Sequence, residues 1–355
     1  AVALSLLAGG VGGVVGGALS DDKSASSSSA SDSSSDSGAP ARAPSGSIES
    51  VAQKVLPSVV MIKVQGNERE GEGSGEIIDA KNGYILTNNH VASGAGRGAK
   101  MSVVFSDGTT APATLVGGDS VYDIAVIKVT GKNDLKQASF GSSKNLQVGQ
   151  QVVAIGSPLG LAGTVTTGIV SSLNRPVATN PTAGDRAGSV IDAIQTDAAI
   201  NPGNSGGALA DMNGNIVGIN TAIASLGGGP DQQSGSIGLG FAIPIDQAKR
   251  IAEQLIKFGK AVHPVIGIEV RSDQDIDDGA LVVRLTQDGP AAKVGIPVDS
   301  VVTKLNSRII DSSNALIAAV RSYMPGEKVT LTYREPNNGP TKTVEVTLAS
   351  SDGGR

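Results

Sequence analysis

Ser205 stands in a segment that suits a nucleophilic serine. Residues 203–207 read Gly-Asn-Ser-Gly-Gly, and glycines on both sides of a serine let the backbone fold tightly, with successive N–H groups directed at one point. We therefore expect Gly203, Asn204 and Ser205 to form an oxyanion hole, with the N–H groups of Gly203 and Ser205 as donors. A plain hairpin turn or an anion-binding nest is the alternative. A phosphate loop would be followed by a basic residue or a helix, whereas this segment runs into a strand-like one.

A serine nucleophile needs a base, and the chain has two histidines in all. His90 lies in residues 87–91, Thr-Asn-Asn-His-Val, between an expected strand and a glycine-rich turn, so its ring would project from a loop into a cleft. An isolated histidine is more often structural, and His90 becomes a candidate base only together with Ser205. His263 precedes a proline in an expected interdomain linker, and we assign it no chemistry.

Asp123 is the expected orienting acid. It opens residues 124–129, Ile-Ala-Val-Ile-Lys-Val, an apolar segment that reads as a buried strand, and its alternative role is to cap that strand. Only this aspartate both opens such a strand and lies between the histidine and the serine. The order His-Asp-Ser is one of the known orders of a Ser–His–Asp triad. Three other aspartates compete on chemistry alone: Asp107, Asp119 and Asp197.

Composition narrows the class of protein. The 355 residues include no cysteine and carry a formal net charge of −5, which rules out disulfides, thiolate metal sites and a cysteine nucleophile. An acidic chain without a cluster of Lys and Arg is a poor polyanion binder, so nucleic acid is not an expected partner. No metal ligand set and no cofactor are expected.

The first 46 residues differ from the rest. Residues 1–19 carry no charge and are long enough for a membrane-spanning helix, and a cleaved signal sequence is the alternative. Residues 20–46 are rich in Ser, Asp, Ala and Gly and lack apolar periodicity, which predicts a disordered linker. We therefore expect a single-pass membrane anchor followed by a flexible tether.

The remaining chain predicts two folded domains. About a dozen short apolar segments separated by Gly, Asp and Asn turns predict a mostly β first domain, built as paired barrels or as a sandwich. Helices are expected from Ser47 to about residue 56 and on residues 245–256, where apolar residues share one face and Gly259 ends the run. Residues 263–348 alternate strands with one helix at 313–323, which predicts a second, small α/β domain.

Several ordered motifs together resemble the HtrA (DegP-like) serine protease family. They are residues 73–75 (Gly-Ser-Gly), 87–91, 123–126 (Asp-Ile-Ala-Val), 154–161, 195–198 (Gln-Thr-Asp-Ala), 203–207 and 238–244. The resemblance covers about residues 48–348. With an anchor and tether in front, the chain is most similar to the membrane-anchored actinobacterial members of PepD type.

This resemblance implies a fold, partners and a location. It implies a chymotrypsin-like protease domain of two six-stranded β-barrels at 47–260 and a PDZ domain at 261–355, in which Ile266, Gly267 and Ile268 form the peptide-binding loop. It further implies a homotrimer without cofactor that digests misfolded or regulatory proteins in stress response and protein quality control. Polypeptides would be its substrates, and C-terminal peptides would bind the PDZ domain. With the anchor, both domains would lie outside the cytoplasm on a single-pass membrane protein.

Substrate preference is expected to follow from the residues before the serine. Ala199 stands six residues ahead of Ser205, where trypsin-like enzymes place the base of the S1 pocket, and we expect Ile200 and Ile219 beside it. Small or medium apolar P1 residues should therefore be preferred over basic ones. Two rival functions stay open: a chaperone or peptide-binding protein with minor proteolytic activity, and a tethered scaffold in which the protease fold is only structural.

Overall fold

The structure is a computed structural model that describes residues 43–66, 70–93, 96, 98–157, 163–178, 190–221, 236–271 and 278–352. These residues all fall within one unit, Arg42–Arg355. The expected anchor at 1–19, and the tether at 20–46 as far as residue 42, lie outside the described residues. Among the helices that are described, none is long and apolar enough to cross a membrane.

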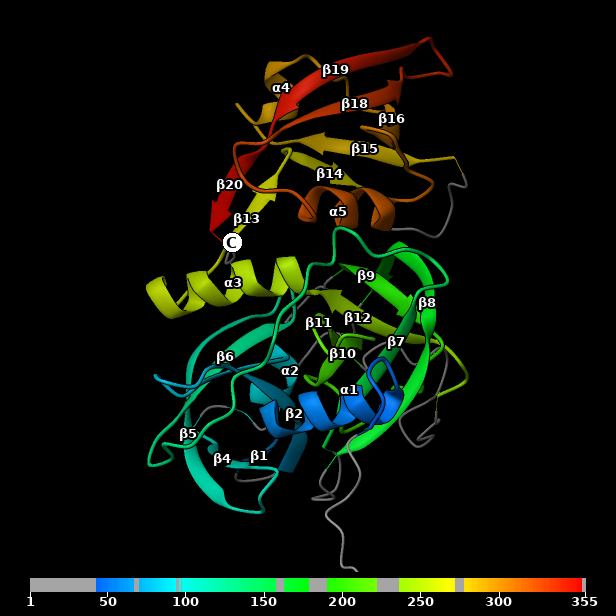
Figure 1. Cartoon of the computed structure of the whole chain (residues 1–355). Helices are drawn as coiled ribbons and strands as arrows, with labels where there is room; N and C mark the ends of the chain where they lie inside the picture. Colours follow the sequence, from blue (N-terminus) through cyan, green and yellow to red (C-terminus); the bar gives the residue numbers. More distant parts are fainter. Residues whose placement is uncertain are drawn as a thin grey trace, which may run out of the picture. The chain divides into compact units, whose positions relative to one another are not determined.

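The first barrel is formed by the strands drawn from blue to cyan in Figure 1. It closes in the order β1-β2-β3-β6-β5-β4, and every pair is antiparallel. Strand β6 is buried at nearly every position, as its run of Ile and Val predicts for a strand covered on both faces. The six strands are β1 (Val59–Gln65), β2 (Glu70–Asp79), β3 (Tyr84–Thr87), β4 (Lys100–Val104), β5 (Thr110–Asp119) and β6 (Ile124–Val129).

The second barrel, green in Figure 1, repeats this architecture. It closes in the order β10-β11-β12-β9-β8-β7. The expected mostly β fold with two six-stranded barrels is therefore confirmed, and the sandwich alternative is wrong. The strands are β7 (Gln151–Gly156), β8 (Thr164–Ala178), β9 (Val190–Thr196), β10 (Ala208–Asp211), β11 (Ile216–Thr221) and β12 (Gly240–Pro244).

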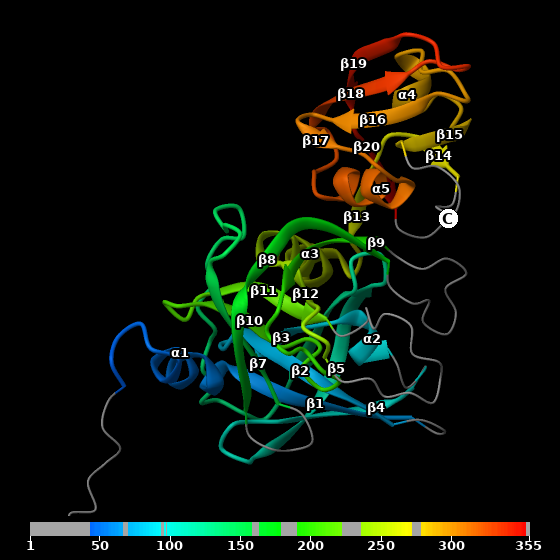
Figure 2. The same ribbon diagram turned by 90° about the vertical axis from the view of Figure 1, so that its right-hand side faces the viewer.

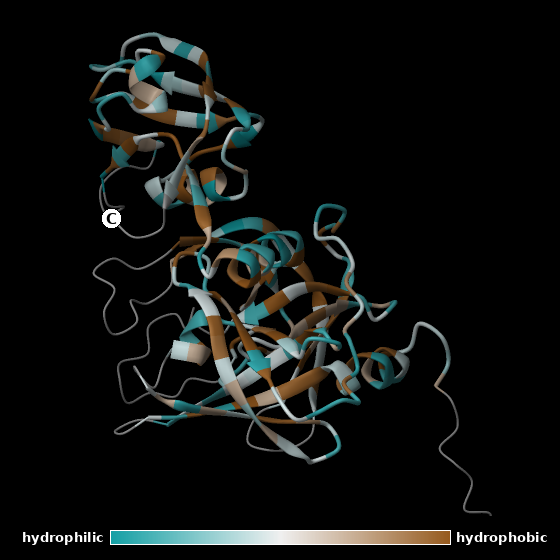
Figure 3. Cartoon of the chain, turned by 90° about the vertical axis from the view of Figure 1, so that its left-hand side faces the viewer, coloured by the Kyte–Doolittle hydropathy of each residue, from teal (hydrophilic) through white to brown (hydrophobic). Residues whose placement is uncertain are grey.

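An apolar layer lies between the two barrels. Its buried members include Val59 and Leu86 from the first barrel and Val153 and Ile155 from the second. Separate clusters fill the interior of each barrel, and in Figure 3 the barrel strands accordingly carry long hydrophobic stretches. Burial of this layer fixes how the barrels face each other, because apolar area removed from water stabilises by about 25 cal/mol per Å².

Helices and one short turn cover the barrels. Helix α1 (Ile48–Val55) follows the 47–56 expectation: Ser47 is its N-cap and accepts from the Ser50 N–H at 3.2 Å. A 3-10 turn, η1 (Leu56–Ser58), leads into β1. Helix α3 (Ile245–Phe258) packs on β5 and β6 of the first barrel and on β11 and β12 of the second. It ends at Gly259 in the left-handed conformation, as expected. Helix α2 (Asn89–Ser93) was not expected, since residue 90 was placed in a loop.

The C-terminal domain is a mixed helix and sheet structure (Figure 2). Its main sheet follows the order β14-β15-β16-β18-β19, and a separate pair joins β13 to β20. The backbone turns at Gly267, with φ +73, and this turn separates β13 from β14. The elements are β13 (Val262–Val265), β14 (Ile268–Val270), β15 (Ala280–Leu285), α4 (Pro290–Lys293), β16 (Val301–Leu305), β17 (Arg308–Ile309), α5 (Ser313–Arg321), β18 (Lys328–Arg334), β19 (Thr341–Thr347) and β20 (Ala349–Asp352).

Candidate active site

His90 and Asp123 form a hydrogen-bonded pair at one end of the first barrel. His90 lies in the first turn of α2, and its ring Nδ1 is 2.9 and 3.0 Å from the two carboxylate oxygens of Asp123. The backbone N–H of His90 donates to the same carboxylate at 2.9 Å. A carboxylate accepts only, so Nδ1 carries the proton and Nε2 of the neutral ring is left as the acceptor. The histidine side chain is 23% exposed and that of the aspartate 5%, so the base reaches solvent and its partner does not.

Asp123 is held from several sides. Its backbone has φ 54, in the left-handed region that aspartate tolerates better than most residues. The amide of Asn88 donates to its carbonyl oxygen at 3.0 Å. The hydroxyl of Thr221, on β11 of the second barrel, donates to its carboxylate at 3.4 Å. Residues of both barrels thus fix Asp123.

The serine loop packs directly against β2 of the first barrel. The Ser74 N–H donates to the carbonyl of Ser205 at 2.8 Å, and the Ser74 hydroxyl donates to the carbonyl of Gly203 at 2.6 Å. Gly73 lies between the two catalytic segments: a methyl group there would meet Val91 at 2.6 Å and the Ser205 carbonyl at 3.1 Å. Only glycine at this position lets the loop approach so closely.

Gly206 makes a second close approach. Its φ is +82, and an added β-carbon would lie 2.2 Å from the Ser74 carbonyl and 2.4 Å from the Thr87 hydroxyl. The nucleophile loop therefore lies against the last residue of β3, just ahead of His90. The structure brings the expected base, acid and nucleophile to one place: the first barrel supplies His90 and Asp123, and the loop before β10 supplies Ser205.

The expected oxyanion residues do not all point the same way. The Asn204 N–H donates to the Asn201 carbonyl at 2.9 Å, so it turns back into the loop instead of toward a substrate. Gly203 has φ +94, a conformation that favours glycine and turns the backbone at the entrance to the loop. Asn204 itself is 2% exposed, and its side chain packs against the glycine of β7, Gly156. Asn204 therefore supports the conformation of the serine loop through its contacts with Asn201 and Gly156.

The three residues expected at S1 lie in different surroundings. Ala199 is half-buried, and its carbonyl accepts from the Thr166 hydroxyl at 2.9 Å. Ile200 lies in the apolar cluster inside the second barrel, whereas Ile219 is fully buried in the layer between the barrels. The structure does not bring these two isoleucines into one cluster. Sequence reasoning did not single out Gly240. A β-carbon added at this position would lie 3.0 Å from Ile200.

Ser74 is a site residue that its motif alone did not identify. Besides its two bonds to the serine loop, its hydroxyl accepts from the Ser157 N–H at 2.8 Å, and its carbonyl accepts from Thr87. It is fully buried. Its partners lie 83 and 129 residues away in sequence, so only the folded chain reveals the role. The Gly-Ser-Gly context was the available signal.

The second histidine also has an aspartate partner. His263 Nε2 is 2.7 Å from the carboxylate of Asp119, and the two side chains are 7% and 6% exposed. The other oxygen of Asp119 accepts from the Tyr122 N–H at 2.8 Å. The Tyr122 ring packs against His263 with centroids 5.1 Å apart. The His263–Asp119 pair therefore connects the turn that precedes Asp123 to strand β13, which leads into the C-terminal domain.

Further contacts join the two domains. The Tyr122 hydroxyl donates to the Arg321 carbonyl at 3.1 Å, and burial raises the pKa of Tyr122 to about 12. Arg308 pairs with Asp192 of β9 at 2.9 Å. Burial raises the pKa of that aspartate in spite of the nearby guanidinium, because desolvation disfavours the charged form. The interface is thus tied by several polar contacts around β9 and α5.

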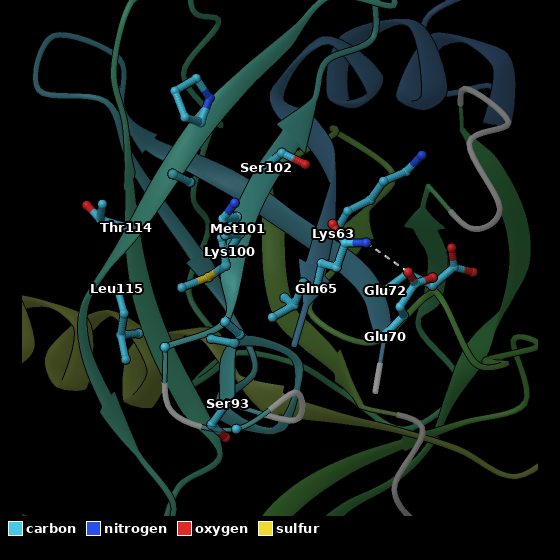
Figure 4. Close-up of a pocket in the computed structure, with 18 of the residues that line it drawn as sticks. Lys63, Gln65, Glu70, Glu72, Ser93, Lys100, Met101, Ser102, Thr114 and Leu115 are labelled. Carbon is cyan, nitrogen blue, oxygen red and sulfur yellow. Dashed lines mark hydrogen bonds between the residues drawn. The ribbon is translucent and has the colours of Figure 1, made fainter. Parts of the chain in front are cut away.

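The described surface includes a hollow in the first barrel and another in the C-terminal domain. The larger, about 1550 Å³, lies at the open end of the first barrel among β1, β2, β4 and β5, and contains none of the expected triad residues. Figure 4 shows its mixed lining, with Gln65 bonded to Glu70 at 3.1 Å. The other, about 970 Å³, lies in the C-terminal domain and is lined by all three residues expected to bind a peptide, Ile266, Gly267 and Ile268. Within the described residues no group of three or more His, Asp or Glu side chains is placed to hold a metal ion.

Comparison with known families defines the class of protein. Residues 73–219 match the trypsin-like peptidase domain and residues 264–348 the PDZ domain. The chain is a serine endopeptidase that carries a PDZ domain. It belongs to the HtrA family of serine proteases, as two relatives show. It is 55% identical over 314 residues to serine protease PepD of Mycobacterium tuberculosis, covering 86% of this chain and 67% of the relative.

The other relatives agree. The periplasmic pH-dependent serine endoprotease DegQ of Escherichia coli is 37% identical over 339 residues, covering 86% of this chain and 70% of DegQ. The solved structure of the HtrA-type protease AlgW with a tripeptide superposes with a TM-score of 0.62 at 32% identity, covering 86% of this chain and 97% of that one. The family resemblance of the sequence motifs is therefore confirmed.

Proposed function

We propose that His90, Asp123 and Ser205 are the catalytic triad of this endopeptidase. Ser205 attacks the scissile carbonyl while His90 Nε2 takes its proton, and the imidazole later returns that proton to the leaving amine. Asp123 holds the Nδ1–H tautomer and stabilises the imidazolium that forms. The N–H groups of Gly203 and Ser205 are the proposed oxyanion donors, and Asn204 supports their loop.

The observation that carries this proposal is that the Asp123 carboxylate contacts both the ring and the backbone of His90. Both carboxylate oxygens of Asp123 lie within 3.0 Å of His90 Nδ1, and one of them also accepts from the His90 backbone N–H. A ring fixed at that edge presents its opposite nitrogen in one direction. The close packing of Gly73 and Gly206 brings the serine loop to that side of the molecule.

The decisive experiment is labelling with a fluorophosphonate, which reacts with an activated serine. Wild type should be labelled and should degrade casein, and Ser205→Ala should do neither while keeping its thermal unfolding profile. Ser157→Ala is a matched control, because that serine contributes only its backbone N–H to Ser74. Labelling that survives Ser205→Ala would place the nucleophile elsewhere.

For specificity we propose an S1 pocket at Ala199 and Ile200 that accepts small or medium apolar P1 side chains. Gly240 packs against this wall, since a β-carbon added there would meet the Ala198 carbonyl at 2.8 Å and Ile200 at 3.0 Å. Ile219 is kept only as support behind the wall, because it has no exposed surface. In a peptide library, apolar P1 residues should be cleaved faster than Arg, and fastest cleavage after Arg would contradict the assignment.

The substrates and the location follow from the relatives. DegQ is named as periplasmic, and we propose that this enzyme works outside the cytoplasm on misfolded or regulatory proteins, in quality control and stress response. Its PDZ groove would bind C-terminal peptides by strand addition beside β14, with the carboxylate on the backbone of residues 266–268. The enzyme would assemble as a homotrimer, which analytical ultracentrifugation of the full chain tests.

We propose the domain limits and the attachment separately. The protease domain would comprise residues 47–260 and the PDZ domain residues 261–355, with residues 20–46 as a tether and residues 1–19 as a membrane anchor. Limited proteolysis should cut first within the tether. Fractionation of cells that express the chain with and without residues 1–19 tests the anchor: recovery of both forms in the soluble fraction would contradict it.

A further inference from the structure

Glu76 is a carboxyl group buried where an apolar side chain would be expected. It lies in the middle of β2, has no exposed surface, and neither of its carboxyl oxygens bonds to another described residue. Its cross-strand neighbours are Val59 of β1 and Leu86 of β3. Both neighbours belong to the apolar layer between the barrels.

The direction of the side chain follows from strand alternation. Successive residues of a strand point to opposite faces. A β-carbon on Gly75 would meet Ile62 and Ile85 inside the first barrel, so Glu76 points the other way, toward the second barrel. Strand β2 contacts β7 of that barrel. The carboxyl therefore lies in the contact between the two barrels, on the same face of β2 as Ser74.

The surroundings offer this carboxyl no counter-ion. Burial raises its pKa well above the ordinary value of 4.5, and its own backbone amide opposes this only weakly. No charged side chain contributes to the shift, and strand β7 carries no ionisable residue. The ionisable groups on β2 itself and on the other elements packed against it are Glu70, Glu72 and Asp79 of β2, Lys63 of β1, Tyr84 of β3, His90 of α2, and Lys132, Asp134, Lys136 and Lys144 of the connection after β6.

We propose that Glu76 is held as an uncharged acid between the two barrels, and that its ionisation loosens the contact that sets His90 against Ser205. Ionisation of Glu76 at alkaline pH would then lower the fraction of the enzyme that is folded and active. The geometry supports this, because a bare carboxylate in an apolar layer is far costlier than a neutral carboxyl there. The part concerning activity rests on the proposed triad, and the part concerning stability does not.

The direction of the pH effect can be stated. Above the ordinary glutamate pKa the unfolded chain has lost this proton while the folded chain keeps it, so the folded state binds more protons. The free energy of unfolding therefore falls as pH rises from about 4.5 toward the raised pKa of Glu76. The stabilisation that the folded chain gains by keeping Glu76 protonated is fully present below this pH window and is lost above it.

The test compares thermal unfolding of the full chain with Glu76→Gln, an isosteric side chain that never ionises. The melting temperature of the variant minus that of wild type should grow by about 5 °C or more between roughly pH 5 and pH 8. Glu72→Gln, an exposed glutamate on the same strand, is the matched control and should show a constant difference. A difference for Glu76→Gln that stays constant over this range would overturn the proposal.

A second measurement keeps the proposal falsifiable if Glu76→Gln folds poorly. The infrared difference spectrum of wild type minus Glu76→Val at neutral pH should contain the carbonyl band of a protonated carboxyl, and a carboxylate band in its place would refute the uncharged state.

Cleavage of a peptide by wild type should also decline at a lower pH than cleavage by the variants. If stability follows the expectation but the cleavage profiles coincide, the link to His90 and Ser205 is wrong. Retained labelling of Ser205 keeps that outcome distinct from failure of the triad.

Discussion

The chain uses a histidine–aspartate pair twice, and the two pairs differ chiefly in their surroundings. His90 and Asp123 face the serine loop with the imidazole partly exposed, whereas His263 and Asp119 are both buried. In the first pair one ring nitrogen is held and the other is available for proton transfer. In the second, the imidazole is enclosed by the Tyr122 ring and the β13 strand. The same pair of residue types thus forms the proposed catalytic base in one place and a buried structural contact in the other.

The largest expected effect comes from removing the charge of the first pair. Asp123→Asn should lower kcat by about 10⁴-fold, because an amide can donate to Nδ1 and stabilise the wrong tautomer. Stability should change little, since asparagine also tolerates the left-handed backbone at this position. Steady-state kinetics and thermal unfolding of the same preparation measure both. A loss of less than tenfold would remove Asp123 from the proposed triad.

The second pair should show the reverse pattern. His263→Phe keeps a ring beside Tyr122 but leaves the Asp119 carboxylate buried without its partner, which should lower the free energy of unfolding by about 3–5 kcal/mol. Denaturant unfolding measures this. At temperatures where the variant stays folded, kcat/KM should remain within about threefold of wild type.

The control for this prediction is the matched substitution His90→Phe. It should abolish cleavage and lower the free energy of unfolding by about 1 kcal/mol or less, since His90 is partly exposed and Asp123 keeps the backbone N–H of residue 90. Adding Asp119→Asn to His263→Phe should restore part of the lost stability, because the unpaired charge is removed. Equal stability losses at the two histidines would contradict the comparison.

The smallest expected effect lies between the two pairs. Gly118 precedes Asp119, and a β-carbon there would lie 2.3 Å from the side-chain oxygen of Asn89, the neighbour of His90. Gly118→Ala should therefore displace that amide, at a cost of about 1 kcal/mol in stability and less than about tenfold in kcat/KM. Gly71→Ala, where nothing lies within 4 Å of the added carbon, is the control. An unchanged kcat/KM would show that the two pairs are independent.

Local patterns were sufficient to predict much of the fold. Strands were expected where branched apolar residues alternate or run together. The helix expected on residues 245–256 from its apolar face and Gly259 is observed as α3, Ile245–Phe258. Both signals are local, because they depend on neighbours within one element. Helix α2 was missed, since a segment of only five residues, Asn89–Ser93, is too short to display a helical period.

Contacts between distant residues were beyond sequence reasoning. The partner of His263 lies 144 residues away, and that of the Ser74 hydroxyl 129 residues away. The burial of Glu76 depends on the second barrel packing over β2, which no local pattern of the strand encodes. The proposed nucleophile, base and acid could be predicted because each is marked by its own short motif, whereas supporting residues such as Ser74 are defined by what packs against them.

The division of the proposed triad between the barrels has a consequence for synthesis. A nascent chain emerges from its N-terminus, and N-terminal domains fold first. A chain arrested before residue 205 would hold His90 and Asp123 but no attacking group, and so would be harmless to its neighbours. Proteolytic activity would appear only after the second barrel, which ends with β12, has been made and has closed on the first.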